Sequence, residues 1–241
     1  MMEINNINIG NVVTDSVFIG NTECKDIYIG TNHVYHKEGY KGIGIMFTDN
    51  SIIDYSNITA NQQYTREDII GITIQNNDVS IIISPDNPSK AYFCNGKAIC
   101  PFAVLEATFT IAGAKYLGEE ATATLRTTLT GDQNWAVNKA YNTIINGQHC
   151  YLPYAGELRI IYENRAYINE LLERCGCSAL PGGDYWSSAL LQRVDADGNI
   201  TSDANGYLQY VAGINFTSAD YWGLNVQGYY NVLPITKLNI P

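Results

Sequence analysis

Residues 150–158 read CYLPYAGEL and residues 184–188 read DYWSS, and these two stretches decide the fold of this chain of 241 residues. A helix is expected directly after Pro153, with Glu157 in its first turn, where a negative charge suits the positive end of the helix dipole. The apolar stripe of this helix is formed by Leu158, Ile161, Ile168, Leu171 and Leu172. We expect the helix to end at Gly176.

A second helix is expected upstream, at residues 132–145. Its apolar face is formed by Val137, Ala140, Tyr141 and Ile144. Asp132 is suited to cap its first turn, and Gly147 is suited to end it.

Short runs of β-branched and aromatic residues, bounded by polar turns, predict strands on both sides of the helices. The strands occupy residues 43–48, 69–74, 79–83, 91–94, 207–216 and 226–235, with loops at 84–89, 192–205 and 217–223. Trp186, in a strand, and Trp135 are expected in the core. Strands, two helices and then further strands indicate an α+β fold.

The chain opens with a ten-residue repeat, in which Ile-Gly falls at residues 9–10, 19–20 and 29–30. Each unit has the pattern of a strand followed by a tight turn. Strands this short cannot bury a core of their own, so we expect residues 1–38 to form a docking or oligomerisation segment. The alternative is that residues 1–38 form an ordinary N-terminal meander of the main domain. We place the main domain at residues 39–241.

Three ordered motifs resemble the core of C-type-lectin-fold domains related to the formylglycine-generating-enzyme fold. They are LPYAGEL at 152–158, Ile-Asn at 168–169 and YWSS at 185–188. Such domains occur in the variable proteins of diversity-generating retroelements, in bacteriophages and gut bacteria. The family's closing motif is similar to YVRPV, and here Leu233 replaces its usual arginine. The resemblance spans roughly residues 40 to 238 and implies a C-type lectin fold whose last segment forms the ligand face.

The N-terminal repeat is similar to stretches near the start of phage tail and baseplate proteins. That resemblance implies a virion protein, at a tail or fibre tip, made in the host cytoplasm. The opening residues agree with this expectation, because they have neither the basic nor the apolar region of a secretion signal.

The composition argues against two classes of partner. Lys and Arg number 14 against 24 Asp and Glu, which gives a formal net charge of −10. Neither a phosphate backbone nor an anionic membrane surface suits such a chain, and no apolar stretch predicts a membrane span. The six cysteines are expected to be free thiols.

We expect no catalytic residues. The family's oxidase members use a cysteine pair near the C-terminal part of the fold, and no cysteine follows Cys177 here. None of the three histidines, His33, His36 and His149, belongs to a recognisable catalytic arrangement. The helix carboxylates Glu157, Glu163, Glu170 and Glu173 have the spacing of a solvated face.

Residues 194–203, which include Asp195 and Asp197, offer oxygen ligands at alternate positions. Their spacing departs from that of a calcium loop, and Asp-Gly-Asn is also an ordinary hairpin turn. We therefore expect no metal and no cofactor.

The remaining signal is aromatic. The C-terminal segment interleaves tyrosines and a tryptophan with small polar residues, as antibody contact loops do. The candidate ligand-binding residues are Tyr207, Tyr210, Asp220, Tyr221, Trp222, Tyr229, Tyr230 and Asn231.

These features predict a phage receptor-binding protein that recognises a bacterial surface protein or glycan. It would attach to other tail proteins through residues 1–38 and form a homo-oligomer, with a trimer favoured. The alternative is a structural virion protein whose aromatic face packs on a neighbouring subunit.

Overall fold

The computed structural model describes residues 42–86, 88–94, 115–130, 132–193, 195–197, 199–202, 204, 206 and 209–238. It also gives the backbone of five short strands outside these ranges, four before residue 37 and one at 105–106. The chain divides into two compact units, Met1–Lys41 and Gly42–Pro241. The division falls three residues beyond the boundary expected from the sequence.

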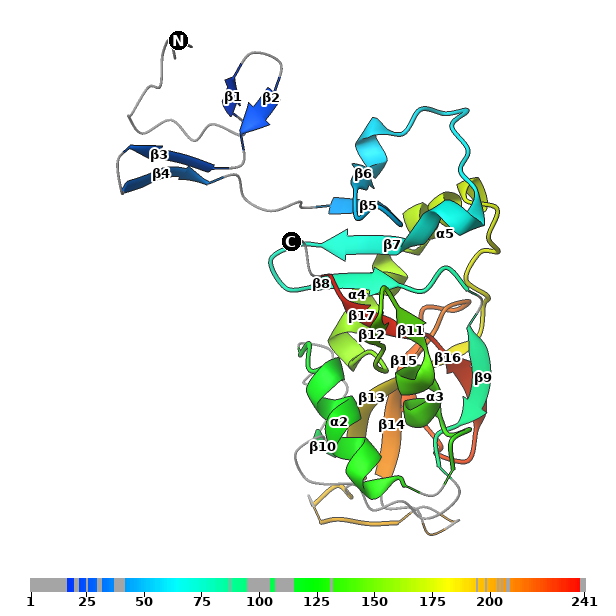
Figure 1. Cartoon of the computed structure of the whole chain (residues 1–241). Coiled ribbons are helices and arrows are strands. Elements are labelled where there is room, and N and C mark those ends of the chain that lie inside the picture. Colours follow the sequence, from blue (N-terminus) through cyan, green and yellow to red (C-terminus); the bar gives the residue numbers. More distant parts are fainter. Residues whose placement is uncertain are drawn as a thin grey trace. The chain divides into compact units, whose positions relative to one another are not determined.

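The first unit consists of two hairpins in its described part (Figure 1). β1 (Val17–Ile19) pairs with β2 (Thr22–Cys24), and β3 (Asp26–Ile29) pairs with β4 (Asn32–His36). In each hairpin the last residue pair includes the isoleucine of the repeat, Ile19 opposite Thr22 and Ile29 opposite Asn32. The isoleucine of the repeat therefore ends the first strand of each hairpin, whereas Gly20, Gly30 and the Ile-Gly at 9–10 lie outside the described residues.

The described part of the second unit contains two large sheets and one small two-stranded sheet. The first is antiparallel, with the order β17-β8-β7-β5-β6. Its strands are β5 (Gly42–Phe47), β6 (Ile52–Asp54), β7 (Ile69–Gln75), β8 (Ser80–Ile83) and β17 (Ile235–Lys237). The C-terminal strand thus returns to pair with a strand from the beginning of the unit. Two 3-10 turns, η1 (Tyr55–Asn57) and η2 (Arg66–Asp68), lie in the connection between β6 and β7.

The second sheet has the order β15-β14-β13-β16-β9. Its strands are β9 (Ser89–Tyr92), β13 (Asp184–Gln192), β14 (Gln209–Asn215), β15 (Tyr221–Leu224) and β16 (Tyr229–Val232), and β10 (Leu105–Glu106) also pairs with β13. The pairs β13–β16 and β13–β10 are parallel, and the others are antiparallel.

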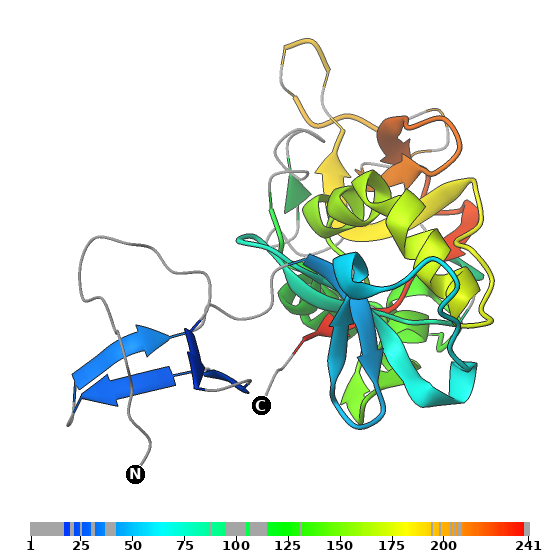
Figure 2. The same cartoon turned by 90° about the horizontal axis from the view of Figure 1, so that it is seen from above.

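The helices are α2 (Gly118–Thr128), α3 (Ala136–Asn142), α4 (Ala155–Glu163) and α5 (Arg165–Arg174), and a small hairpin of β11 (Ile144–Ile145) and β12 (Gln148–His149) follows α3. Helices α4 and α5 lie between the two sheets (Figure 2). Helices α2 and α3 contact strands of the second sheet, α2 at β13 and α3 at β9 and β16.

Helices therefore cover both faces of the second sheet. The side chains of the DYWSS strand β13 are buried on both faces for this reason. Tyr185 and Trp186 point to opposite faces, and both are fully buried. Trp186 belongs to the core shared with α2 and α3, whereas Tyr185 belongs to the core shared with α4, α5 and the first sheet. The prediction of a buried Trp186 is confirmed, and Trp135 is partly buried against the same core.

Two helix predictions need correction. The helix expected at 132–145 is only α3, because Ile144 and Ile145 pair with β12 and Gly147 adopts a positive φ of 74° after them. The helix after Pro153 is interrupted at Asn164, which ends α4 and precedes α5. Helix α2 was not predicted, since its threonine-rich sequence has low helix propensity.

Glu157 is also corrected, because it is buried rather than on a solvated face. Its Oε2 accepts a hydrogen bond of 2.7 Å from the backbone N–H of Tyr154, at the start of α4. The carboxylate also accepts the backbone N–H of Gly118, at the start of α2, and the Tyr151 hydroxyl at 3.3 Å. One side chain therefore joins the first turns of two helices, which is the physical role of the Glu in LPYAGEL.

The mixed architecture confirms the α+β fold class. Among the described residues, no helix has the length and hydropathy that a membrane span requires.

Candidate binding site

Exposed aromatic side chains gather on the second sheet. Four of the five exposed aromatic residues in the described part of the chain, Tyr92, Tyr221, Trp222 and Tyr229, lie on its strands. Trp222 is 45% exposed and Tyr229 is 53% exposed. Large aromatic side chains are normally buried in such a sheet, so their exposure here marks a candidate contact surface.

Two polar side chains lie beside Trp222 at the start of β13 and the end of β14. The Trp222 indole N–H donates to Oδ1 of Asp184 at 3.2 Å, and the Asn215 amide donates to the same oxygen at 2.9 Å. Asp184 and Asn215 are paired in register, so the sheet itself holds the carboxylate beside the indole.

On the other side of β13, β16 and β9 supply tyrosines. Tyr229 and Tyr92 face each other in register, with ring centroids 5.0 Å apart and an interplanar angle of 52°. This tilted geometry is favourable for two aromatic rings and leaves both side chains about half exposed.

Tyr230 follows Tyr229 in β16 and points to the opposite face of the sheet, the face on which Trp186, Asp184 and Trp222 lie. Its ring packs edge-on against Trp186, with centroids 4.7 Å apart, so that part of the side chain belongs to the core. Burial and the nearby Asp184 carboxylate both raise the pKa of the Tyr230 hydroxyl. We call Tyr92, Asp184, Asn215, Trp222, Tyr229 and Tyr230 the aromatic band, since they lie near one end of five neighbouring strands, Tyr92 and Tyr229 on one face of the sheet and the other four on the opposite face.

Asn231 was predicted to contact a ligand, and this prediction is wrong. The side chain is only 3% exposed. Its amide donates to the backbone carbonyls of Asp184 at 3.0 Å and of Gly182 at 3.4 Å. Asn231 supports the strand from which Asp184 projects.

The remaining predicted site residues are dispersed. Tyr221 starts strand β15 rather than lying in a loop, and its ring approaches Tyr162 of α4 with centroids 6.4 Å apart. Asp220 is exposed in the turn before it. Tyr210 is half-buried, and its hydroxyl accepts a hydrogen bond from Arg193. Tyr207 lies outside the described residues.

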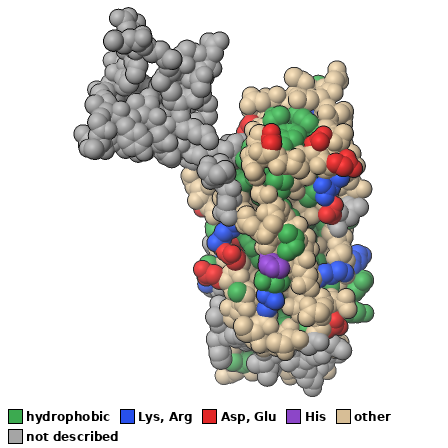
Figure 3. Space-filling model, viewed as in Figure 1, with side chains coloured by type: hydrophobic (Ala, Val, Ile, Leu, Met, Phe, Trp, Pro, Cys, Tyr) green, Lys and Arg blue, Asp and Glu red, His purple; other side chains and the backbone are tan. Residues whose placement is uncertain are grey.

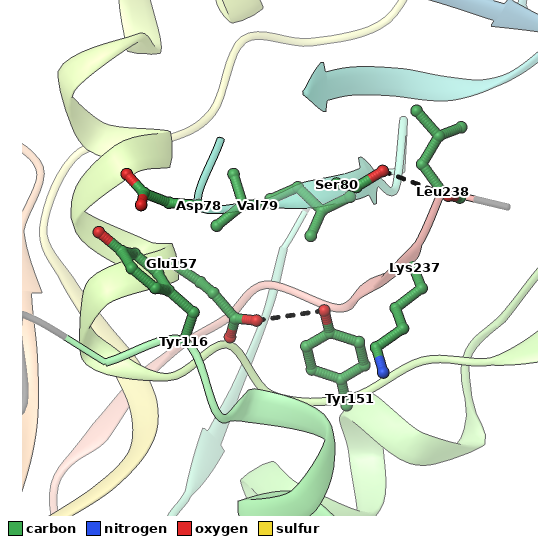
Figure 4. Close-up of a pocket in the computed structure, with 9 residues that line it drawn as sticks. Asp78, Val79, Ser80, Tyr116, Tyr151, Glu157, Lys237 and Leu238 are labelled. Atoms are coloured by element: carbon green, nitrogen blue, oxygen red, sulfur yellow. Dashed lines mark hydrogen bonds between the residues drawn. The ribbon is translucent and has the colours of Figure 1, made fainter. Parts of the chain in front are cut away.

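A separate pocket of about 300 Å³ lies beside Glu157 (Figure 4). Tyr151, Tyr116, Asp78 and Lys237 line it as well, and Lys237 forms an ion pair with Glu119 of α2. Burial raises the pKa of Glu157 to about 7. The Glu157 oxygens already accept three internal hydrogen bonds. We therefore interpret the pocket as a space left where the two helices meet, not as an active site.

The other polar candidates have structural partners. Asp195 Oδ1 accepts the backbone N–H groups of Asp197 and Asn199, as in an ordinary turn. The His149 ring stacks on Tyr141 at 4.1 Å. In the described ranges, no three His, Cys, Asp or Glu side chains come together as metal ligands would.

Charge is mixed on the face of the molecule shown in Figure 3, where acidic and basic side chains alternate. The thiols of Cys150, Cys175 and Cys177 are free, and burial raises the pKa of Cys175 to about 12. A thiol with such a pKa is a poor nucleophile at neutral pH.

Sequence reasoning missed three members of the aromatic band, Tyr92, Asp184 and Asn215. For Tyr92 a signal existed, because it alternates with the buried Ala91 and Phe93. Asp184 and Asn215 become neighbours only through the pairing of β13 with β14, 31 residues apart, which no local pattern reveals.

Comparison with protein-family models, with curated proteins and with solved structures found no match to this chain.

Proposed function

We propose that this protein is a receptor-binding protein, which recognises a bacterial surface molecule through the aromatic band. The observation that carries the proposal is the exposure of Tyr92, Trp222 and Tyr229 near one end of one sheet, with the polar groups of Asp184 and Asn215 held beside Trp222. Exposed aromatic anchors beside fixed hydrogen-bonding groups are what recognition surfaces use.

Rigidity supports the same proposal. The band stands on strands rather than on loops, and helices pack on the sheet beneath it. A surface held in this way loses little conformational entropy when a partner binds. By contrast, a catalytic site would need a nucleophile beside a base, and the described partners of the Asp184 carboxylate, Trp222 and Asn215, are not nucleophiles.

We assign the second unit to the C-type lectin fold as part of this proposal. Its support is the position of the motifs: LPYAGEL opens α4, and DYWSS begins the central strand β13. The C-terminal strand β17 pairs with β8, and Ile235 forms a further bridge to Tyr151. The C-terminal strand of the second unit is therefore joined both to the first sheet and to the segment just before α4.

The N-terminal unit has the proposed role of docking the protein to other tail proteins of a phage virion, or to two further copies in a trimer. Its two described hairpins have strands of three to five residues. Hairpins of this size need an additional surface to become stable. Several copies on one particle would also strengthen weak binding through effective concentration.

Adsorption of the labelled protein to a panel of bacterial strains tests the proposal. We expect the Trp222→Ala, Tyr229→Ala double variant to lose at least about tenfold in binding to the strain that captures the wild type. Tyr167→Ala is the matched control, because Tyr167 is an exposed tyrosine on α5 and is 48% exposed. Unchanged adsorption of the folded double variant would favour the alternative, in which the band packs on a neighbouring virion subunit.

A further inference from the structure

Asp184 differs in its partners from the carboxylates that form ion pairs. Several carboxylates have a cation beside them, such as Asp86 with Arg66 at 2.8 Å and Glu170 with Arg174 at 2.7 Å. The hydrogen-bond donors that Asp184 has among the described side chains, Trp222 and Asn215, are both neutral. Within the described part of the chain, no Lys, Arg or His comes within ion-pair distance of it.

The surroundings of Asp184 are aromatic. The Trp222 indole lies on one side, joined to it by the 3.2 Å hydrogen bond, and Tyr230 lies on the neighbouring strand. An aromatic face attracts a cation, and an aromatic face beside a carboxylate attracts it more strongly. Lys90 belongs to the same sheet, but β9 is two strands away from β13, about 10 Å at the usual strand spacing.

We propose that the aromatic band binds an arginine side chain of a partner protein, with the guanidinium group on Asp184 and its plane against Trp222. This inference rests on the proposed function and specifies its ligand. A guanidinium group is planar, stacks on aromatic rings and donates hydrogen bonds to carboxylates in a fixed geometry. Lysine offers a point charge without the flat surface.

The negative charge of the binding surface favours a protein over a polysaccharide as the partner. Anionic polysaccharides are repelled by Asp184, by the exposed Asp220 and by the net charge of −10. A neutral glycan gains nothing from the charge of Asp184, whereas an arginine neutralises it. The partner is therefore a bacterial surface protein that presents an exposed arginine.

The test is a titration of the full chain, labelled with ¹⁵N, with N-acetyl-arginine amide and separately with N-acetyl-citrulline amide at constant ionic strength. Citrulline has nearly the same shape but no charge. We expect saturable shifts of the Trp222 indole N–H signal with arginine, and binding weaker by about tenfold with citrulline. Trp222→Phe assigns the signal, and the indole signals of the less exposed Trp135 and Trp186 serve as internal controls.

Asp184→Asn should reduce the affinity for arginine to that for citrulline. The comparison of the two amides on the wild type needs no variant, so it decides the question even if Asp184→Asn fails to fold. Equal affinities, or no saturable shift with arginine, would overturn the proposal. A saturable shift with methyl α-mannoside and none with arginine would also overturn it and would identify a glycan as the ligand.

The proposed receptor function is tested separately from the proposal that the ligand is an arginine. Loss of adsorption in the Trp222→Ala, Tyr229→Ala variant, together with equal binding of the two amides, would retain the binding surface and reject arginine. Unchanged adsorption in that variant would reject the surface itself.

Discussion

Two carboxylates of this protein lie in contrasting settings. Glu157 is enclosed at the junction of α2 and α4, where it accepts hydrogen bonds from Tyr154, Tyr151 and Gly118. Asp184 is half-buried at the end of the second sheet and accepts hydrogen bonds from two exposed or half-buried side chains. The first carboxylate has its acceptor capacity committed to the fold, and the second retains capacity for a partner.

The comparison separates architecture from recognition. At the helix junction the backbone approaches so closely that a Cβ on Gly156 would collide with the Lys115 carbonyl, and one on Gly118 would collide with Glu157. A side chain at either glycine should therefore lower the stability of the junction. In the aromatic band the side chains touch solvent, so their substitution should affect binding more than folding.

The largest effect is expected from Glu157→Ala. It leaves the N–H groups of two helix starts and the Tyr151 hydroxyl without their acceptor, so we expect a loss of about 3 kcal/mol in the free energy of unfolding. Urea denaturation measures it. Glu163→Ala is the control, since its ion pair with Arg159 is exposed and 3.7 Å long, and it should change stability by less than about 0.5 kcal/mol.

Asp184→Ala should lower the free energy of unfolding by about 1 kcal/mol, an effect between those of Glu157→Ala and Glu163→Ala. The reason is that Trp222 and Asn215, which donate to Asp184, can form hydrogen bonds with water instead. If Asp184→Ala destabilised the protein as much as Glu157→Ala, the distinction between the two carboxylates would be lost.

The pH dependence of stability sharpens the comparison. Burial raises the pKa of Glu157 from 4.5 to about 7 in the folded protein. Below pH 4.5 the carboxyl is protonated in both states. Between pH 4.5 and 7 the unfolded chain releases the proton first, so the contribution of Glu157 to stability falls as the pH rises and is constant above pH 7.

Thermal or urea unfolding of the wild type and of Glu157→Gln over this range isolates that contribution. The wild type should lose stability relative to Glu157→Gln, with a difference in slope of up to about 1.4 kcal/mol per pH unit. Parallel curves would show that Glu157 does not titrate in this range.

An effect of the same size as that of Asp184→Ala is expected from the residue that supports the band. Asn231→Ala removes two hydrogen bonds to backbone carbonyls and should lower stability by about 1 kcal/mol. Its effect on binding should be indirect, since the side chain is buried. An isolated loss of binding at unchanged stability would return Asn231 to the contact surface.

The sequence predicted those parts that depend on local chemistry. The strand of DYWSS, the helix start after Pro153 and the buried Trp186 follow from short-range pattern. The burial of Glu157 could not be predicted, because α2, its second partner, begins 39 residues earlier and has a threonine-rich sequence. The aromatic band could not be predicted for the same reason, because its residues come from strands far apart in the sequence.

Within the band, the exposure of Trp222 and Tyr229 agrees with the prediction, whereas Asn231 does not. A composition rich in tyrosine and asparagine indicates a polar aromatic surface but not the direction of each side chain. That direction is set by the strand pairing, in which Asn231 lies opposite Tyr185 in the interior of the sheet.

Photo-crosslinking from the aromatic band tests the central claim most directly. A benzoylphenylalanine placed at Trp222, and in a second protein at Tyr167 of α5, is irradiated on the bacterial strain that captures the wild type. We predict a covalent adduct with a bacterial surface protein from position 222 and none from position 167. An adduct from position 167 alone would contradict the account, since the molecule would then bind its receptor by another face.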